Sequence, residues 1–289
     1  MTTNKTKRPE ITKSVRPKTQ IIDVRDEYNE IKSFPITGEL PLTIYVNKKE
    51  VVTLMTLGHY PESLVIGYLR NQGFISSLDD LESVHVDWDT NSAAVKTNSI
   101  LDDFENQLTH KVVTSGCGQG TTFGGVWDDL KNKNLKAKKI KQSIIYKVLK
   151  LLHEKNEIYR QSGAVHGCAI CDENNIIDFI EDVGRHNAVD AIAGNMWLNN
   201  IESDNKIFYT TGRLTSEMVI KVAQMNIPYL ISRSGITEMG LNVARETGVT
   251  LIGRAKGRHF LVYHGSSNIK YDAKPEPRKE GSSDIWKRR

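Results

Sequence analysis

The sequence predicts an α/β protein with a three-layer domain built on a mostly parallel sheet over residues 142–265, preceded by a smaller α+β unit over residues 21–112. Three observations lead to this prediction. From residue 164 onward, strand-like apolar runs alternate with helical patterns, which is typical of βαβ units. Before residue 112, pairs of strand patterns enclose one helical pattern. The length of 289 residues suits about two domains.

The α+β unit contains two predicted hairpins and one helix. The segment "PLTIYVNKKEVVTLMTLG" (41–58) alternates apolar and polar residues on both sides of a polar turn, and "LESVHVDWDTNSAAVKT" (81–97) does the same. Between them, "YPESLVIGYLRNQGFI" (60–75) has a proline near its start and apolar residues at helical spacing. We expect a small sheet with one helix packed on it.

The second unit opens with "SIIYKVLKLLHEKNEIY" (143–159), whose apolar residues recur at helical spacing and predict one helix. A hairpin follows in which "AVHGCAIC" (164–171) and "IIDFIEDV" (176–183) flank the turn "DENN". The rest alternates regularly. We expect helices over 186–198, 214–226 and 237–248, and strands over 206–212, 227–235, 249–255 and 259–265.

Composition limits the cellular context. No stretch approaches the roughly 18 consecutive apolar residues of a membrane span, so we predict no membrane partner. The N-terminus is basic but lacks the apolar run of a secretory signal, and we therefore expect a cytoplasmic protein. The three cysteines, Cys117, Cys168 and Cys171, are too few and odd in number for a disulfide framework.

Basic residues concentrate in three segments. Residues 1–20, 131–141 and 274–289 carry net charges of +5, +6 and +3, whereas the whole chain carries only +4, so the remainder is acidic. We expect flexible basic tails over 1–20 and 270–289, and a glycine-rich loop with a lysine-rich linker over 113–141. Because these runs lack interleaved aromatic residues and a recognition motif, we predict no nucleic-acid partner.

Cations stand at the predicted ends of four successive strands. In open α/β sheets, ligands bind outside the carboxyl ends of the strands, where glycines and helix N-termini suit phosphate oxygens. We therefore expect an anionic, phosphate-bearing ligand; the alternative is that each arginine caps or pairs locally. No Walker loop or dinucleotide-binding motif is present. The candidate residues are Arg185, His186, Arg213, Arg233, Arg254, Lys256 and Arg258.

Cys117 lies in the loop "TSGCGQGTTFGG" (114–125). Five glycines can expose its thiol as a nucleophile. The alternatives are a simple turn, or a phosphate cradle, which the lack of an adjacent basic residue disfavours.

Cys168 and Cys171 form a C-x-x-C pattern but fall on opposite faces of a strand, so we expect buried thiols. The alternative there is a zinc site with His166. We expect Asp190 and Glu217, near helix N-termini, to be structural.

Five motifs occur between the two tails: "SGCG" (115–118), "GRHNAVD" (184–190), "TTGRLTSEMV" (210–219), "SRSG" (232–235) and "GLNVARETGVTLIGRAKGRHFLVYH" (240–264). They closely resemble the motifs of the FdhD family of sulfur carrier proteins. The segment from Glu39 to Asn47 also fits, and the likeness covers nearly all of the chain between the two tails.

The resemblance implies a cytidine-deaminase-like fold for the second unit and a homodimer. It also implies a sulfurtransferase mechanism. In this mechanism a cysteine desulfurase loads sulfur onto Cys117 as a persulfide. The sulfur then passes to the molybdenum of the bis(molybdopterin guanine dinucleotide) cofactor before or during insertion of that cofactor into apo-formate dehydrogenase. The cofactor-binding segment of the family falls on Arg254, Ala255, Lys256, Gly257, Arg258 and His259.

The chain departs from the family pattern at one position. Many members have a second cysteine in the loop, but Gly120 stands there in this chain, so no disulfide can form within the loop. The alternative function is therefore a non-catalytic chaperone that binds the cofactor. Neither H-x-E nor P-C-x-x-C is present, so we expect neither deaminase activity nor a permanently bound metal.

Overall fold

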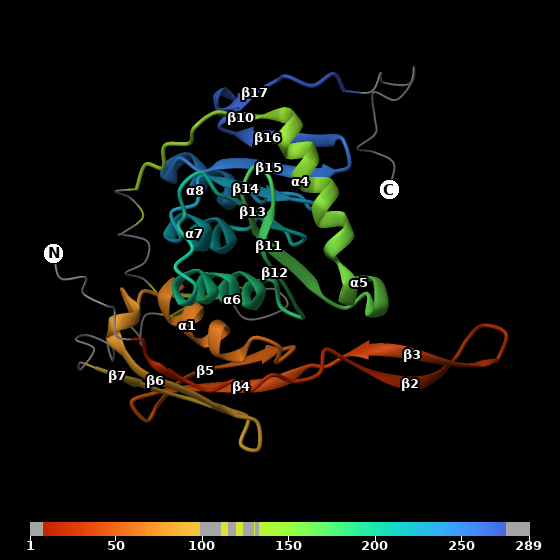
Figure 1. The fold of residues 1–289 in the computed structure, drawn as a ribbon, viewed down its shortest axis with the longest axis vertical. Coiled ribbons are helices and arrows are strands. Elements are labelled where there is room, and N and C mark those ends of the chain that lie inside the picture. The colour runs from red at the N-terminus through yellow and green to blue at the C-terminus, as the bar shows by residue number, and fades with distance from the viewer. Residues whose placement is uncertain (1–7, 99–110, 115–119, 124–129, 131–132, 276–289) are drawn as a thin grey trace.

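The computed structural model describes residues 8–98, 111–114, 120–123, 130 and 133–275. Two sheets form the body, one of five strands from the N-terminal part of the chain and one of six strands from the C-terminal part. Helices α1 (Pro61–Asn71) and α6 (Arg185–Leu198) lie between the two sheets (Figure 1). The fold is therefore a mixed α/β arrangement, as the alternating sequence pattern predicts.

The five-stranded sheet has the order β1-β6-β7-β4-β5. Both predicted hairpins form, and α1 lies between them within its expected range. The strands are β1 (Glu10–Ile11), β4 (Leu40–Val46), β5 (Lys49–Thr56), β6 (Leu81–Asp87) and β7 (Ser92–Thr97). The short β1 lies inside the segment expected to be a tail and pairs in parallel with β6. The Thr12 and Ser14 hydroxyls extend this attachment, because they bond to Glu62 and to the Val86 carbonyl oxygen. Chain order thus begins before residue 20.

The six-stranded sheet has the order β12-β11-β13-β14-β15-β16. The expectation of a mostly parallel sheet is wrong, since only β13–β14 and β14–β15 are parallel pairs. The reason is that tight turns join β11 to β12 and β15 to β16, and a tight turn permits only antiparallel pairing. The strands are β11 (His166–Cys171), β12 (Ile176–Asp182), β13 (Ile207–Thr210), β14 (Tyr229–Ser232), β15 (Thr250–Lys256) and β16 (His259–His264).

Helices cover both faces of this sheet. Alternate strand residues face opposite sides, so Cys168 and Ile170 join a core with α6, α7 (Ser216–Gln224) and α8 (Glu238–Thr247), whereas Ala169 and Cys171 join a core with α4 (Gln142–Lys155). The first core is continuous with the apolar face of the N-terminal sheet. The two sheets therefore share one buried apolar cluster.

The helix expected over residues 143–159 is interrupted. Helix α4 ends at Lys155, Asn156 leaves the helical region with φ −68° and ψ 70°, and α5 (Glu157–Ser162) begins anew. The cause is a tertiary contact, because the Glu181 carboxylate accepts hydrogen bonds from the backbone N–H groups of Ile158 and Tyr159. A carboxylate at that place satisfies the first free donors of a new helix.

Three strand pairs stand apart from the main sheets. β2 (Thr19–Arg25) and β3 (Ile31–Thr37) form an antiparallel ribbon that extends away from the body (Figure 1). β8 (Lys111–Thr114) and β9 (Gly120–Phe123) form another antiparallel pair. Near the C-terminus, β10 (Ile140–Lys141) pairs in parallel with β17 (Ile269–Lys270).

Helix length sets one limit on the fold. The longest helices in the described part of the chain, α4 and α6, have 14 residues each. Among the described residues, no helix combines the length and the apolarity needed to cross a membrane.

Helices α1 and α6 touch through their backbones. A Cβ atom added to Gly67 would lie 1.7 Å from the carbonyl oxygen of Asp190, and one added to Gly194 would lie 1.9 Å from the carbonyl oxygen of Ser63. Only glycine fits at these two positions, since real Cβ atoms do not approach backbone atoms so closely. The Ser63 hydroxyl bonds to the Asn195 side chain beside the crossing.

We expect Gly67→Ala to lower the free energy of unfolding by about 3 kcal/mol or more, because the added methyl group forces the two helices apart. Gly38→Ala is the matched control, since a Cβ there meets nothing within 4 Å. Chemical denaturation of both variants measures the difference. Equal stabilities would show that the helices separate without cost.

Candidate functional site

The largest hollow that we consider lies between α4 and the strand ends of the six-stranded sheet. We call it the basic hollow; its volume is about 920 Å³. Its lining residues come from α4 and Asn156, from Tyr209 and Arg233, and from the β15–β16 turn. They are Ser143, Tyr146, Lys147, Leu149, Lys150, His153, Glu154, Asn156, Tyr209, Arg233, Ala255, Lys256, Gly257 and Arg258.

Helix α4 supplies one wall through its exposed face. Tyr146, Lys150 and His153 follow one another at i, i+4 and i+7, so they lie along one side of the helix. The opposite side, with Ile145, Val148 and other apolar residues, is buried in the second core. The amphipathic pattern that packs α4 on the sheet thus also presents its cations to the hollow.

The β15–β16 turn supplies the other wall. Lys256 pairs with His259, which leaves Gly257 and Arg258 as a two-residue turn. Gly257 has φ +58°, a left-handed conformation that favours glycine at the start of such a turn. Arg254 also has a positive φ, +50°, at an irregularity in the pairing of β15 with β16. This irregularity bends the end of β15 and projects the turn over α4.

The basic hollow is positively charged. Its lining includes five lysine or arginine side chains and one carboxylate, Glu154. Aromatic rings lie among these cations, since the Arg258 guanidinium stands 5.4 Å from the centroid of the Tyr146 ring. Burial raises the pKa of Tyr209 to about 12, so its hydroxyl stays protonated. Cations beside aromatic rings suit a ligand that carries phosphate groups and a planar base.

A second, smaller hollow adjoins the first through Arg233. We call it the strand-end hollow; its volume is about 450 Å³, and His166, Thr211 and Ser234 also line it. The Thr211 hydroxyl accepts from the backbone N–H of Gly167, which fixes the strand end. Burial, together with the charges of Arg185 and Arg213, lowers the pKa of His166. His166 is therefore a neutral ring beside cationic neighbours at physiological pH.

The structure brings together only some of the residues that the sequence nominates. Arg233, Ala255, Lys256, Gly257 and Arg258 line the basic hollow. Arg254 and His259 are exposed directly beside that group, and Arg213 is exposed at the end of β13, outside the lining of both hollows. Most of the candidate residues between Arg254 and His259 therefore lie together at the basic hollow.

Arg185 and His186 lie elsewhere. Both are buried in the first turn of α6, and His186 Nε2 stands 3.4 Å from a carboxylate oxygen of Glu217. Burial and nearby cations lower the pKa of His186 well below its usual value, so the ring is neutral. Asp190 and Glu217, expected to be structural, are also buried and form ion pairs with Lys221. These residues form a separate polar cluster on the helix side of the sheet.

The cysteines divide into two kinds. Cys168 and Cys171 are buried on opposite faces of β11, as the strand pattern predicts, so the two thiols cannot share one metal ion. Burial raises the pKa of each thiol to about 12. Cys117 lies outside the described residues, in the segment that joins β8 to β9. Reactivity at Cys117 stays a prediction.

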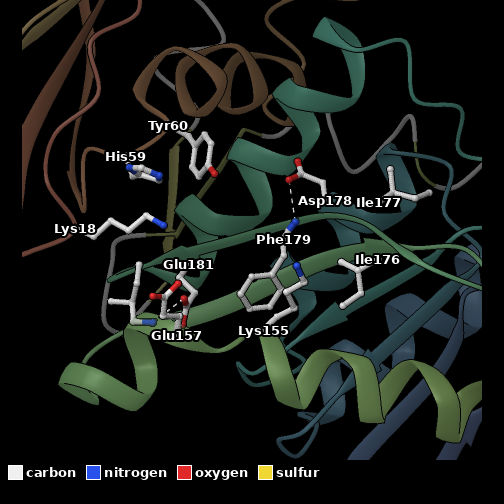
Figure 2. Close-up of a pocket in the computed structure, with 11 residues that line it drawn as sticks. Lys18, His59, Tyr60, Lys155, Glu157, Ile176, Ile177, Asp178, Phe179 and Glu181 are labelled. Carbon is white, nitrogen blue, oxygen red and sulfur yellow. Dashed lines mark hydrogen bonds between the residues drawn. The ribbon is translucent and has the colours of Figure 1, made fainter.

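A third hollow, of about 270 Å³, lies between the N-terminal segment and β12. Lys18, His59 and Tyr60 lie above Phe179 and Glu181 in Figure 2. Two of its carboxylates are already engaged, because Glu181 accepts from the backbone at the start of α5 and Asp178 accepts from the Asn195 side chain and the Phe179 N–H. The lining residues therefore hold α5 and β12 in place, and we do not assign a ligand to this hollow.

The sequence analysis missed the contribution of α4. The sequence predicts a helix for the segment that contains Lys147, Lys150 and His153, but no role in binding. The lysine-rich segment 131–141 beside it is the more conspicuous basic feature of the sequence. The sequence shows that these residues share one side of a helix. The turn at Gly257 that faces them in the structure is more than a hundred residues further along the chain. Only the topology places the two together.

Comparison with known proteins identifies similar chains. A family model described as the FdhD/NarQ family matches residues 37–270. A sulfur carrier protein FdhD of Listeria monocytogenes serotype 4b (strain F2365) is 31% identical over 245 residues, which cover 84% of this chain and 94% of the relative. A protein of the same name from Bacillus pumilus (strain SAFR-032) is 31% identical over 252 residues, which cover 86% and 96%.

A solved structure shares the fold. A crystal structure from Desulfotalea psychrophila, of a protein described as a proposed formate dehydrogenase accessory protein, matches with a TM-score of 0.69. The match covers 88% of this chain and all of the other, at 24% identity. At that identity the likeness establishes the common architecture.

GDP serves as the probe, because it carries the phosphates and the guanine base of the cofactor that the family resemblance implies. We expect Lys256→Gln and Arg258→Gln each to weaken the binding of GDP roughly tenfold or more, because each removes a charge-assisted contact to phosphate. Isothermal titration calorimetry measures the dissociation constants. Lys136→Gln, an exposed lysine outside the lining of the basic hollow, is the matched control and should bind GDP as the unaltered chain does. Unchanged affinity in both test variants would place the ligand elsewhere.

Proposed function

The chain belongs to the FdhD/NarQ family, and from that membership we propose that it is a sulfur carrier required for formate dehydrogenase activity. In this proposal Cys117 accepts sulfur as a persulfide and passes it to a molybdenum cofactor held in the basic hollow. The relatives named sulfur carrier protein FdhD support the general role.

The division of the cysteines carries the proposal. A persulfide carrier needs a thiolate that a partner protein can reach. Cys168 and Cys171 are buried with raised pKa values, so neither thiol is accessible or ionised near neutral pH. Cys117 is the only other cysteine of the chain, and it stands among glycines.

Loading requires no net oxidation. The Cys117 thiolate attacks the outer sulfur of a persulfide on a cysteine desulfurase, a new S–S bond forms, and the desulfurase cysteine leaves as a thiolate. In the second step the S–S bond at Cys117 breaks, and Cys117 leaves as the thiolate. The sulfur then arrives at the oxidation level of elemental sulfur, so the molybdenum centre supplies the electron pair that makes it a sulfide.

The basic hollow suits the cofactor substrate. Bis(molybdopterin guanine dinucleotide) carries pyrophosphates and guanine rings. Lys256, Arg258 and Arg233 offer cations for the phosphates, and Tyr146 and Tyr209 offer aromatic surface. We propose that the segment Arg254 to His259 is the main contact, with Arg213 and Arg233 extending it along the strand ends. Arg185 and His186, which lie on the buried side of α6, would act only indirectly.

The remaining parts of the proposal follow from the family. We propose that the partners are a cysteine desulfurase and apo-formate dehydrogenase, that the chain is a homodimer, and that it acts in the cytoplasm. We also propose that the second unit is a cytidine-deaminase-like domain without deaminase chemistry. A sheet with helices on both faces supports that assignment, as does the lack of the H-x-E motif in the sequence.

One observation favours a second function. Gly120 occupies the place of the second loop cysteine found in many family members, so no neighbouring thiol in the loop can resolve the persulfide. A chaperone that binds and delivers the cofactor without transferring sulfur would not need that thiol. The two functions differ in whether Cys117 is essential.

We expect the purified chain to gain the mass of one sulfur atom at Cys117 after incubation with a cysteine desulfurase and cysteine. Intact-mass and peptide mass spectrometry detect the modification. Cys171→Ala is the matched control and should be loaded like the unaltered chain, because its thiol is buried.

The companion experiment separates the two functions in cells that lack their own carrier. Cys117→Ala should fail to restore formate dehydrogenase activity while still binding GDP. Restored activity with this variant would reject sulfur transfer and favour the chaperone.

A further inference from the structure

A cavity of about 370 Å³ lies on the seam between α1, α6 and α7, apart from the two hollows at the strand ends. We call it the acidic cavity. Tyr68 of α1, His186 and Asp190 of α6, and Glu217 and Lys221 of α7 line it. All five side chains are less than 9% exposed, so the polar interior is removed from bulk water.

Ion pairs and hydrogen bonds hold the walls of the acidic cavity. Lys221 Nζ stands 2.7 Å from Asp190 Oδ2 and 3.6 Å from Glu217 Oε1. The other Asp190 oxygen accepts from the Asn71 side chain at 2.7 Å. Three helices thus contribute to one fixed arrangement of polar groups, in which α6 and α7 supply the charges and α1 supplies an amide. Such an arrangement requires little reorganisation to receive a ligand.

Two polar atoms in this wall have no hydrogen-bond partner among the residues that the structure describes. They are the Tyr68 hydroxyl and His186 Nδ1, and their residues are 3% and 6% exposed. Buried polar atoms are almost always paired, with protein groups, water or a ligand. Because His186 is neutral and its Nε2 faces the Glu217 carboxylate, Nε2 carries the proton and Nδ1 is an acceptor. The cavity therefore lacks a donor at this place.

The charged residues that line the cavity are mainly acidic. Glu39, Asp190 and Glu217 supply three carboxylates, and Lys221 supplies one ammonium group. An excess of carboxylate charge beside buried groups is costly unless a counter-charge accompanies it.

We propose that the acidic cavity binds a small molecule through a primary ammonium group. The ammonium N–H groups donate to His186 Nδ1 and to the Tyr68 hydroxyl oxygen, and the positive charge balances the excess carboxylate. Leu54 and Met55, at the side of the cavity formed by β5, contact the carbon portion of the molecule. Among the described residues, no cluster of histidines, cysteines and carboxylates is suited to a metal ion, so an organic cation fits better.

This site is independent of sulfur transfer. It uses no cysteine, and none of its residues lines the basic hollow or the strand-end hollow. A chain that does not transfer sulfur can still be tested for ammonium binding, and a chain that does not bind the ammonium group can still be tested for sulfur transfer.

The test is an NMR titration of the full chain with methylammonium chloride, at constant ionic strength, that follows the side-chain nitrogens of His186. Tetramethylammonium chloride is the matched probe, because it has the same charge and no N–H donor. We expect a saturable shift of the His186 Nδ1 signal with methylammonium alone. No saturable shift, or the same shift with tetramethylammonium, overturns the proposal.

Tyr68→Phe provides the matched variant. It removes a hydroxyl that has no protein partner, so the free energy of unfolding should be unchanged or higher, whereas methylammonium should bind about tenfold more weakly. Tyr271→Phe, at an exposed tyrosine, should bind methylammonium as the unaltered chain does. Undiminished binding in Tyr68→Phe would show that the cavity does not hold the ammonium group as proposed.

Discussion

The close approach of α1 to α6 is the contact on which the rest of the structure depends. Gly67 and Gly194 let the two helix backbones touch, and this brings the five-stranded sheet under the helices of the six-stranded sheet. The same crossing places Asn71 within hydrogen-bond distance of Asp190 and thereby completes the buried charge network with Lys221. The acidic cavity exists because these helices meet at a fixed distance. The basic hollow, in contrast, depends on how α4 packs on the far face of the sheet and on the β15–β16 turn that faces it.

Local patterns predicted most of the secondary structure, because apolar periodicity reports which side of an element is buried. The helices α1, α6, α7 and α8 and the hairpins of β4–β5, β6–β7 and β11–β12 lie where these patterns indicate. The errors have tertiary causes. Strand direction in the larger sheet follows from tight turns at its two edges, and the break at Asn156 follows from a carboxylate on β12. The short β1 pairs with a strand some seventy residues away, which no local pattern reveals.

The candidate site was predictable where residues of suitable chemistry stand next to one another in the sequence. The cationic segment after β15 is contiguous in sequence, and it lines the basic hollow largely as its residue types suggest. The lysines of α4 were not identified, because their pairing with that segment exists only in three dimensions. Arg185 and His186 share the strand-end position of the other cations, yet the first turn of α6 buries both of them. A position at a strand end therefore does not by itself decide whether a side chain faces a ligand or the core.

The helix crossing also bears on how the chain is made. A ribosome releases the N-terminal part first, so α1 and its sheet emerge well before α6, which ends at Leu198. During that interval the glycine face of α1 and the apolar residues beside it have no partner. Elongation, not the chemistry of the crossing, sets how long the surface stays uncovered. The nascent N-terminal unit therefore keeps this surface exposed until about two thirds of the chain has been synthesised.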